Sequence, residues 1–138
     1  MLKKRKGPKD WSPRGDVVWE PVWPEFVEAY LETALWSGTD SDGNPLDKDY
    51  SIGDFSDEAV EEAIKDCDDF VKANKEDLES VGDKSSHGHD FSLTRNGHGA
   101  GFWDRGYGAA GKRLTEAAKA YGSADVYVGD DRKLYFTG

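Results

Sequence analysis

One stretch of the chain, HDFSLTRNGHGAGFWDRGYG from His89 to Gly108, gathers side chains that can do chemistry. Imidazoles, carboxylates, guanidinium groups and an amide stand there among glycines, which let a ligand or another backbone approach closely. Such groups exchange protons, bind metal ions or form directed hydrogen bonds. The candidate binding residues in this stretch are His89, Asp90, Thr94, Arg95, Asn96, His98, Trp103, Asp104 and Arg105.

Metal binding is the first chemistry that the stretch suggests. His87, His89 and His98 are the three histidines of the chain, and Asp90 and Asp104 stand nearby. Imidazole and carboxylate ligands suit zinc or a redox metal, but H-x-H-D is a weak pattern without a second histidine cluster. We therefore predict no metal site and no cofactor.

Nucleophilic catalysis and dinucleotide binding have less support. Ser92 or Thr94 could serve as a nucleophile, yet the sequence has no G-x-S-x-G turn to present one. Residues 106–111, GYGAAG, match the dinucleotide fingerprint G-x-G-x-x-G and open a predicted helix. That fingerprint works only directly after a strand, and here residues 96–105 intervene. A weaker anion site at this helix start, with Lys112 and Arg113, stays open.

Two interpretations of the stretch remain. In the first, Thr94, Arg95, Asn96 and His98 form a recognition surface, with Trp103 as an aromatic anchor and Arg105 as a bidentate donor. In the second, Asp90 or Asp104 pairs with Arg95 or Arg105, and the resulting network folds a long turn under Trp103. The sequence does not decide between them.

The charge of the chain is unevenly distributed. The net charge is −10 over 138 residues, yet residues 1–15 carry six basic side chains and one acid. Residues 40–79 carry 15 acidic and 4 basic side chains. An acidic body repels nucleic acid and attracts basic partners, so we expect no direct nucleic-acid binding by this part. The basic arm could contact an anion, contact the acidic body or remain a solvated tail.

Helical periodicity is clear in two segments before the motif. Pro24 opens a first helix that Gly38 ends, with an apolar stripe that includes Phe26, Tyr30 and Leu35. Ser56 caps a second helix, whose stripe includes Cys67, so we predict a core role for this thiol. The opposite face of the second helix carries the acidic residues Glu58, Glu61, Glu62, Asp66 and Asp69.

The rest of the chain predicts a small sheet and one more helix. Residues 91–94 alternate apolar and polar side chains, which indicates a short strand after a flexible connection. A third helix is expected from Ala109 to Tyr121, and residues 125–137 predict two strands around a tight turn at 129–131. The predicted class is α+β: two N-terminal helices, then strand, helix, strand and strand, with helices on one face of the sheet. We expect a flexible basic arm at 1–21 and one domain at 22–138.

Several segments resemble a family of small uncharacterised proteins of bacteriophages and prophages. They are AYLETALWS, PLDKDYSIGD, DCDDF, HDFSLTRNGHGAGFWDRG, LTEAAKAYG and VYVGDD, and the resemblance spans roughly residues 25–131. Ser92 stands where the family pattern has Trp, a difference that we expect to loosen an aromatic contact near Phe91. The resemblance implies a protein made inside a bacterial cell, in the cytoplasm, and it implies no activity.

The expected function is that of a non-enzymatic acidic binding protein. Its acidic helix face would engage a basic host or phage protein, a mode of host modulation that includes mimicry of nucleic acid. The alternative is a small metal- or ligand-dependent enzyme built on the stretch from His89 to Arg105. No run of apolar residues is long enough to cross a membrane, so we expect no membrane partner.

Overall fold

The computed structural model describes residues 21–98 and 101–137, and the predicted arm falls outside these ranges except for Pro21. Most of the described chain is helical, and a small two-stranded antiparallel sheet follows, as an α+β class predicts. The helices and strands are α1 (Pro24–Ser37), α2 (Asp57–Ala73), α3 (Lys75–Ser80), α4 (Lys84–Arg95), α5 (Ala109–Lys119), β1 (Val126–Val128) and β2 (Leu134–Phe136). Short 3₁₀ turns lie at residues 46–48, 52–54 and 102–104.

The first two predicted helices are confirmed. Pro24 occupies the first turn of α1, where its missing N–H costs no hydrogen bond. The hydroxyl of Ser56 accepts a hydrogen bond from the Ala59 N–H and so caps α2. Cys67 is fully buried in the apolar stripe of α2, and burial raises the pKa of its thiol. The predicted core role of this cysteine is therefore confirmed.

The strand predicted at residues 91–94 is wrong, because these residues belong to α4. The connection predicted before them is also helical, from Lys84 onward. The carboxylate of Asp83 accepts a hydrogen bond from the Ser86 N–H, which caps the helix. Asn96 ends it, followed by Gly97 with a positive φ of 73°.

The alternation that suggested a strand arises because α4 is covered on several sides. Phe91, Ser92, Leu93 and Thr94 are all buried, so polar and apolar side chains alike face other parts of the protein. A helix enclosed in this way has no solvent face to give it a helical period. The sequence pattern of a half-exposed strand and that of an enclosed helix are then indistinguishable over five residues.

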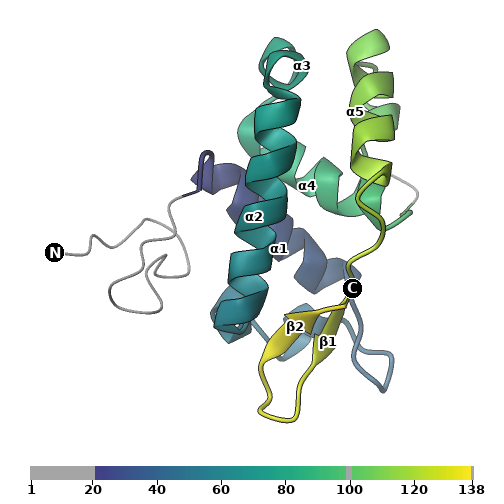
Figure 1. The fold of residues 1–138 in the computed structure, drawn as a ribbon. Coiled ribbons are helices and arrows are strands. Elements are labelled where there is room, and N and C mark those ends of the chain that lie inside the picture. The colour runs from purple at the N-terminus through teal and green to yellow at the C-terminus, as the bar shows by residue number, and fades with distance from the viewer. Residues whose placement is uncertain (1–20, 99–100, 138) are drawn as a thin grey trace, which may run out of the picture.

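The core is built where α1, α2 and α4 meet. Figure 1 shows α2 crossing α1 and α4, with α5 beside α4. Phe91 of α4 stacks on Phe70 of α2 with ring centroids 4.3 Å apart, and it also contacts Phe26 and Tyr30 of α1. Gly88 brings α4 directly against the α1 backbone, because a Cβ placed there would stand 2.0 Å from the Phe26 carbonyl oxygen.

The two predicted C-terminal strands are confirmed as a hairpin at the start of α2 (Figure 1). Val126 pairs with Phe136, and Tyr127 pairs with Tyr135. Leu134 bonds to the chain just before α2, since the Ser56 N–H donates to its carbonyl. The third predicted helix is also present, as α5. Within the described part of the chain, no helix combines the length and apolarity that a bilayer crossing requires.

Candidate functional site

Asp90 and Arg105 form a bidentate ion pair in which only the carboxylate is buried. The Asp90 carboxylate is completely inaccessible to solvent, whereas the Arg105 side chain is 38% exposed. Arg105 donates from Nε at 3.0 Å and from Nη2 at 2.9 Å to the two carboxylate oxygens. These hydrogen bonds raise the pKa of Arg105. The pair ties α4 to the loop that follows it, as the network interpretation of the motif predicted.

Arg95 has a different set of partners, spread over three other segments. Its guanidinium donates to Asp66 Oδ2 of α2 at 2.8 Å and to the Tyr30 hydroxyl of α1 at 3.1 Å. It also donates to the carbonyls of Tyr121 and Gly122, which follow α5. Burial opposes its charge, but Tyr30 and Asp66 outweigh this effect and raise the pKa of Arg95. Arg95 therefore links α4 to α1, to α2 and to the chain after α5 inside the protein.

Thr94, Asn96 and Asp104 of the motif also have internal partners. Thr94 Oγ1 accepts from the Phe102 N–H at 3.3 Å, and Asp104 accepts from the Gly101 N–H at 3.3 Å. The Asn96 amide donates to the Ser92 carbonyl and accepts from the Ala124 N–H at 2.7 Å. Each contact holds the chain after α4 in place. Asp90, Arg95, Asn96 and Asp104 thus diverge toward separate partners.

Ser92 is the exception, because its buried hydroxyl has no hydrogen-bond partner. A Ser92→Ala variant should have a free energy of unfolding about 1 kcal/mol higher than the parent, since an unpaired buried hydroxyl is costly and alanine favours helices. Thr94→Val is the matched control, because it removes a hydroxyl that the Phe102 N–H needs, and it should lower the free energy of unfolding by about 1–2 kcal/mol. Urea denaturation measures both. Equal or reversed effects would contradict these assignments.

His89 lies apart from the other motif residues, in a groove on the α1 side of α4. The groove has a volume of about 500 Å³, and its lining includes Glu32, Thr33, Trp36, Asp47, Ser51 and His89. We call it the Trp36 groove. The Trp36 indole is 48% exposed and stacks on the His89 ring with centroids 5.6 Å apart. Trp36, Thr33 and Asp47 were not predicted as site residues, and the exposed indole at the end of a helix was the signal that could have found them.

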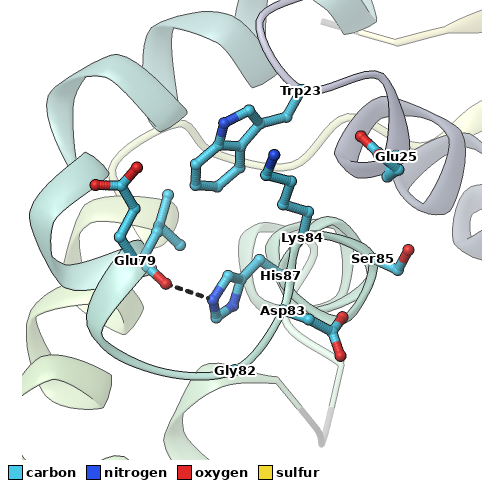
Figure 2. A pocket seen from close by; sticks show the side chains of 9 residues that line it. Trp23, Glu25, Glu79, Gly82, Asp83, Lys84, Ser85 and His87 are labelled. Carbon is cyan, nitrogen blue, oxygen red and sulfur yellow. Dashed lines mark hydrogen bonds between the residues drawn. The ribbon is translucent and has the colours of Figure 1, made fainter.

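A second hollow, of about 720 Å³, lies at the turn between α3 and α4 (Figure 2). Figure 2 shows Lys84 beside Trp23, and its Nζ lies 5.2 Å from the indole centroid. His87 Nε2 is 2.9 Å from the Leu78 carbonyl oxygen and 2.6 Å from that of Val81, so this nitrogen donates and carries the proton. His87 Nδ1 is buried without a partner. His87 thus closes the α3–α4 turn.

The three histidines do not form a cluster. His87 bonds to carbonyls of the α3–α4 turn, His89 lies in the Trp36 groove, and His98 is exposed after α4. Residues two apart on a helix point to different sides, which separates His87 from His89. Among the residues that the structure describes, no three His, Cys, Asp or Glu side chains are placed to hold a metal ion.

The start of α5 does not follow a strand, so GYGAAG lacks the context of a dinucleotide site. Gly108, with φ of 66°, precedes α5. Arg113, considered for an anion site here, instead pairs with Asp77 of α3 through bonds of 2.8 and 2.7 Å. Trp103, considered as a roof or an anchor, is 57% exposed. Arg113 is therefore not free for an anion, and Trp103 does not cover the turn, whereas its exposure leaves the anchor interpretation untested.

The predicted acidic face of α2 divides into two groups. Glu58, Glu61 and Glu62 are exposed. Asp66 pairs with Arg95, and Asp69 accepts a hydrogen bond from the Tyr121 hydroxyl at 2.5 Å. Burial and the bond to Asp69 raise the pKa of Tyr121. Asp66 and Asp69 therefore connect α2 to other segments, and the three glutamates form the outward part of this face.

Comparison of the chain with protein-family models, with curated proteins and with solved structures finds no match.

Proposed function

We propose that this protein is an accessory factor of a bacteriophage or prophage, and that it binds a basic host or phage protein in the bacterial cytoplasm. The resemblance of the motif to phage proteins supports the biological setting. One observation carries the binding function: α2 buries its apolar stripe and turns Glu58, Glu61 and Glu62 to solvent. A surface of like charge attracts partners of opposite charge over about 8–10 Å at moderate ionic strength.

The geometry of the motif supports binding over catalysis. An enzyme needs a nucleophile or base and a stabilising donor converging on one point. The Asp90 carboxylate is instead buried against Arg105, and Arg95 is directed at Asp66 and Tyr30. These contacts support a role for the motif in folding, which leaves the acidic face as the surface for recognition.

The proposal is tested by removing charge from the outward part of α2. The Glu58→Gln, Glu61→Gln, Glu62→Gln triple variant should bind a partner captured from host lysate about tenfold more weakly, because three exposed ion pairs contribute roughly 0.5 kcal/mol each. Affinity of the parent should fall steeply between low and high salt, and that of the variant should fall less. Titration calorimetry with the purified partner at several salt concentrations measures both.

Matched neutralisation elsewhere is the control. Asp42→Asn, Asp49→Asn, Glu116→Gln changes the net charge equally at exposed positions away from α2. If this control weakens binding as much as the α2 variant, net charge alone is responsible and the surface is wrongly assigned. If neither variant changes any interaction, the proposed function is wrong.

A further inference from the structure

We propose that the Trp36 groove binds an arginine side chain of a basic protein partner. This inference rests on the proposed function only for the basic character of the partner, since the groove lies between α1, the 46–54 loop and α4 rather than on α2. Three features of the groove match a guanidinium group: a ring nitrogen that can accept a hydrogen bond, an aromatic face and a pair of carboxylates.

The acceptor is Nε2 of His89. The Thr33 hydroxyl donates its single proton to the Ala29 carbonyl oxygen at 2.7 Å. The same hydroxyl oxygen is 2.9 Å from His89 Nδ1, so it accepts from that nitrogen. In the neutral ring the proton therefore sits on Nδ1, and Nε2 keeps a lone pair. Thr33 is buried, so the fold holds its hydroxyl in place and thereby fixes which nitrogen of His89 carries the proton.

The aromatic face belongs to Trp36. The indole stacks on His89 at an interplanar angle of 28°, which fixes its plane relative to the acceptor. Nearly half of the residue is open to solvent. A planar guanidinium gains more from stacking on an indole than a compact, strongly hydrated ammonium does. The stacked pair thus favours arginine over lysine.

The carboxylates are those of Glu32 and Asp47, which line the groove from α1 and from the 46–48 turn. Both are exposed. The negative surface continues along α1 to Glu28. The pKa of Glu28 is raised, mainly by burial and to a smaller extent by the charges of Glu32 and Glu25. None of the described side chains that line the groove is a lysine or an arginine. The groove therefore matches a cation and disfavours a phosphate or a carboxylate ligand.

The test uses the full chain and short peptides whose other residues are uncharged and which carry two arginines, two lysines or two citrullines. The arginine peptide should shift the Trp36 indole N–H and the His89 ring signals in NMR spectra. It should bind roughly tenfold more tightly than the lysine peptide, because of the stacking and bidentate contacts, and the neutral citrulline peptide should bind more weakly still. Equal binding of all three peptides, or shifts confined to other residues, would overturn the proposal.

Two variants separate the roles of the groove residues. Asn at position 89 can still donate to Thr33 from the place of Nδ1 but offers no acceptor at the place of Nε2, so His89→Asn should weaken arginine binding while the fold is kept. Trp36→Leu should abolish the preference for arginine over lysine. Tyr127→Leu is the control, because Tyr127 is exposed to the same degree outside the groove and its loss should leave peptide binding unchanged.

Other occupants are recognised by the same spectra. The N-terminal arm carries Arg5 and Arg14. If Arg5→Lys, Arg14→Lys shifts the Trp36 signal without any peptide, the arm itself fills the groove and the proposal of a partner is overturned. The Glu32→Gln, Asp47→Asn double variant should lose peptide binding. The Glu58→Gln, Glu61→Gln, Glu62→Gln triple variant should keep it. This result would support the groove as a binding site whether or not the α2 surface binds a partner.

Discussion

A Gly88→Ala variant is expected to lose about 3 kcal/mol of unfolding free energy or to fail to fold. The new Cβ would stand 2.0 Å from the Phe26 carbonyl oxygen and 2.8 Å from its carbonyl carbon. Both atoms are backbone of α1, so no side chain can rotate away. The two helices must separate, and overpacking of this kind typically costs about 1–3 kcal/mol or more.

The direction of this result is informative because helix propensity acts the other way. In an exposed helix, replacing glycine with alanine stabilises by about 1 kcal/mol. A loss at Gly88 therefore measures the close contact between α1 and α4, and a gain would show that these helices do not touch there. Urea denaturation followed by circular dichroism gives the free energy of unfolding.

Gly53→Ala provides the control for this variant. Gly53 lies in a 3₁₀ turn, and a Cβ added there would find its nearest neighbour in the Ser51 hydroxyl oxygen, at an ordinary 3.7 Å. The stability of this variant should stay within about 0.5 kcal/mol of the parent. A comparable loss in both variants would mean that glycine itself, rather than the contact at Gly88, is needed.

The sequence predicted the elements whose signals are local. Pro24 and Ser56 mark the starts of α1 and α2 by their own backbone chemistry, and the hairpin follows from alternation around Gly129. The start of α4 carried an equally local signal in Asp83, and Asn96 with Gly97 marked its end. Gly88 and the polar residues within the helix concealed these signals, because both lower helix propensity.

The functional site was harder to predict because pairing depends on tertiary distance. The sequence offered Arg95 or Arg105 as partners of Asp90, and only the fold assigns Arg105 to Asp90 and Arg95 to Asp66. Likewise, Trp36 and His89 are 53 positions apart, and their stacking follows from the packing of α1 on α4. Residue types identified the chemistry, whereas helix packing determined which groups meet.

Arg95→Met is the second variant for which a large loss is expected, about 3 kcal/mol. Methionine retains an unbranched apolar side chain between the Phe91 and Tyr121 rings, whose centroids lie 5.5 and 5.6 Å from the guanidinium carbon. It removes every hydrogen bond of the guanidinium and leaves the carbonyls of Tyr121 and Gly122 without this donor. Breaking a fully buried ion pair costs about 3–5 kcal/mol, and Asp66, at 36% exposed, recovers part of this in water.

A double-mutant cycle separates the ion pair from the other contacts of Arg95. Asp66→Asn removes one charge and keeps a hydrogen-bond acceptor, so it should cost about 1 kcal/mol. If the pair is coupled, the double variant Arg95→Met, Asp66→Asn should be no less stable than Arg95→Met alone. Simple addition of the two losses would show that Asp66 contributes independently of Arg95.

His98→Ala completes the argument, because His98 belongs to the same motif but is exposed. Its stability should stay within about 0.5 kcal/mol of the parent, whereas Arg95→Met unfolds readily. This contrast decides what the motif does. If both variants stay folded, the motif is available for recognition and the network interpretation is wrong. If only His98→Ala stays folded, the guanidinium of Arg95 is required to hold α1, α2 and α4 to the chain after α5. Recognition is then assigned to the acidic surfaces.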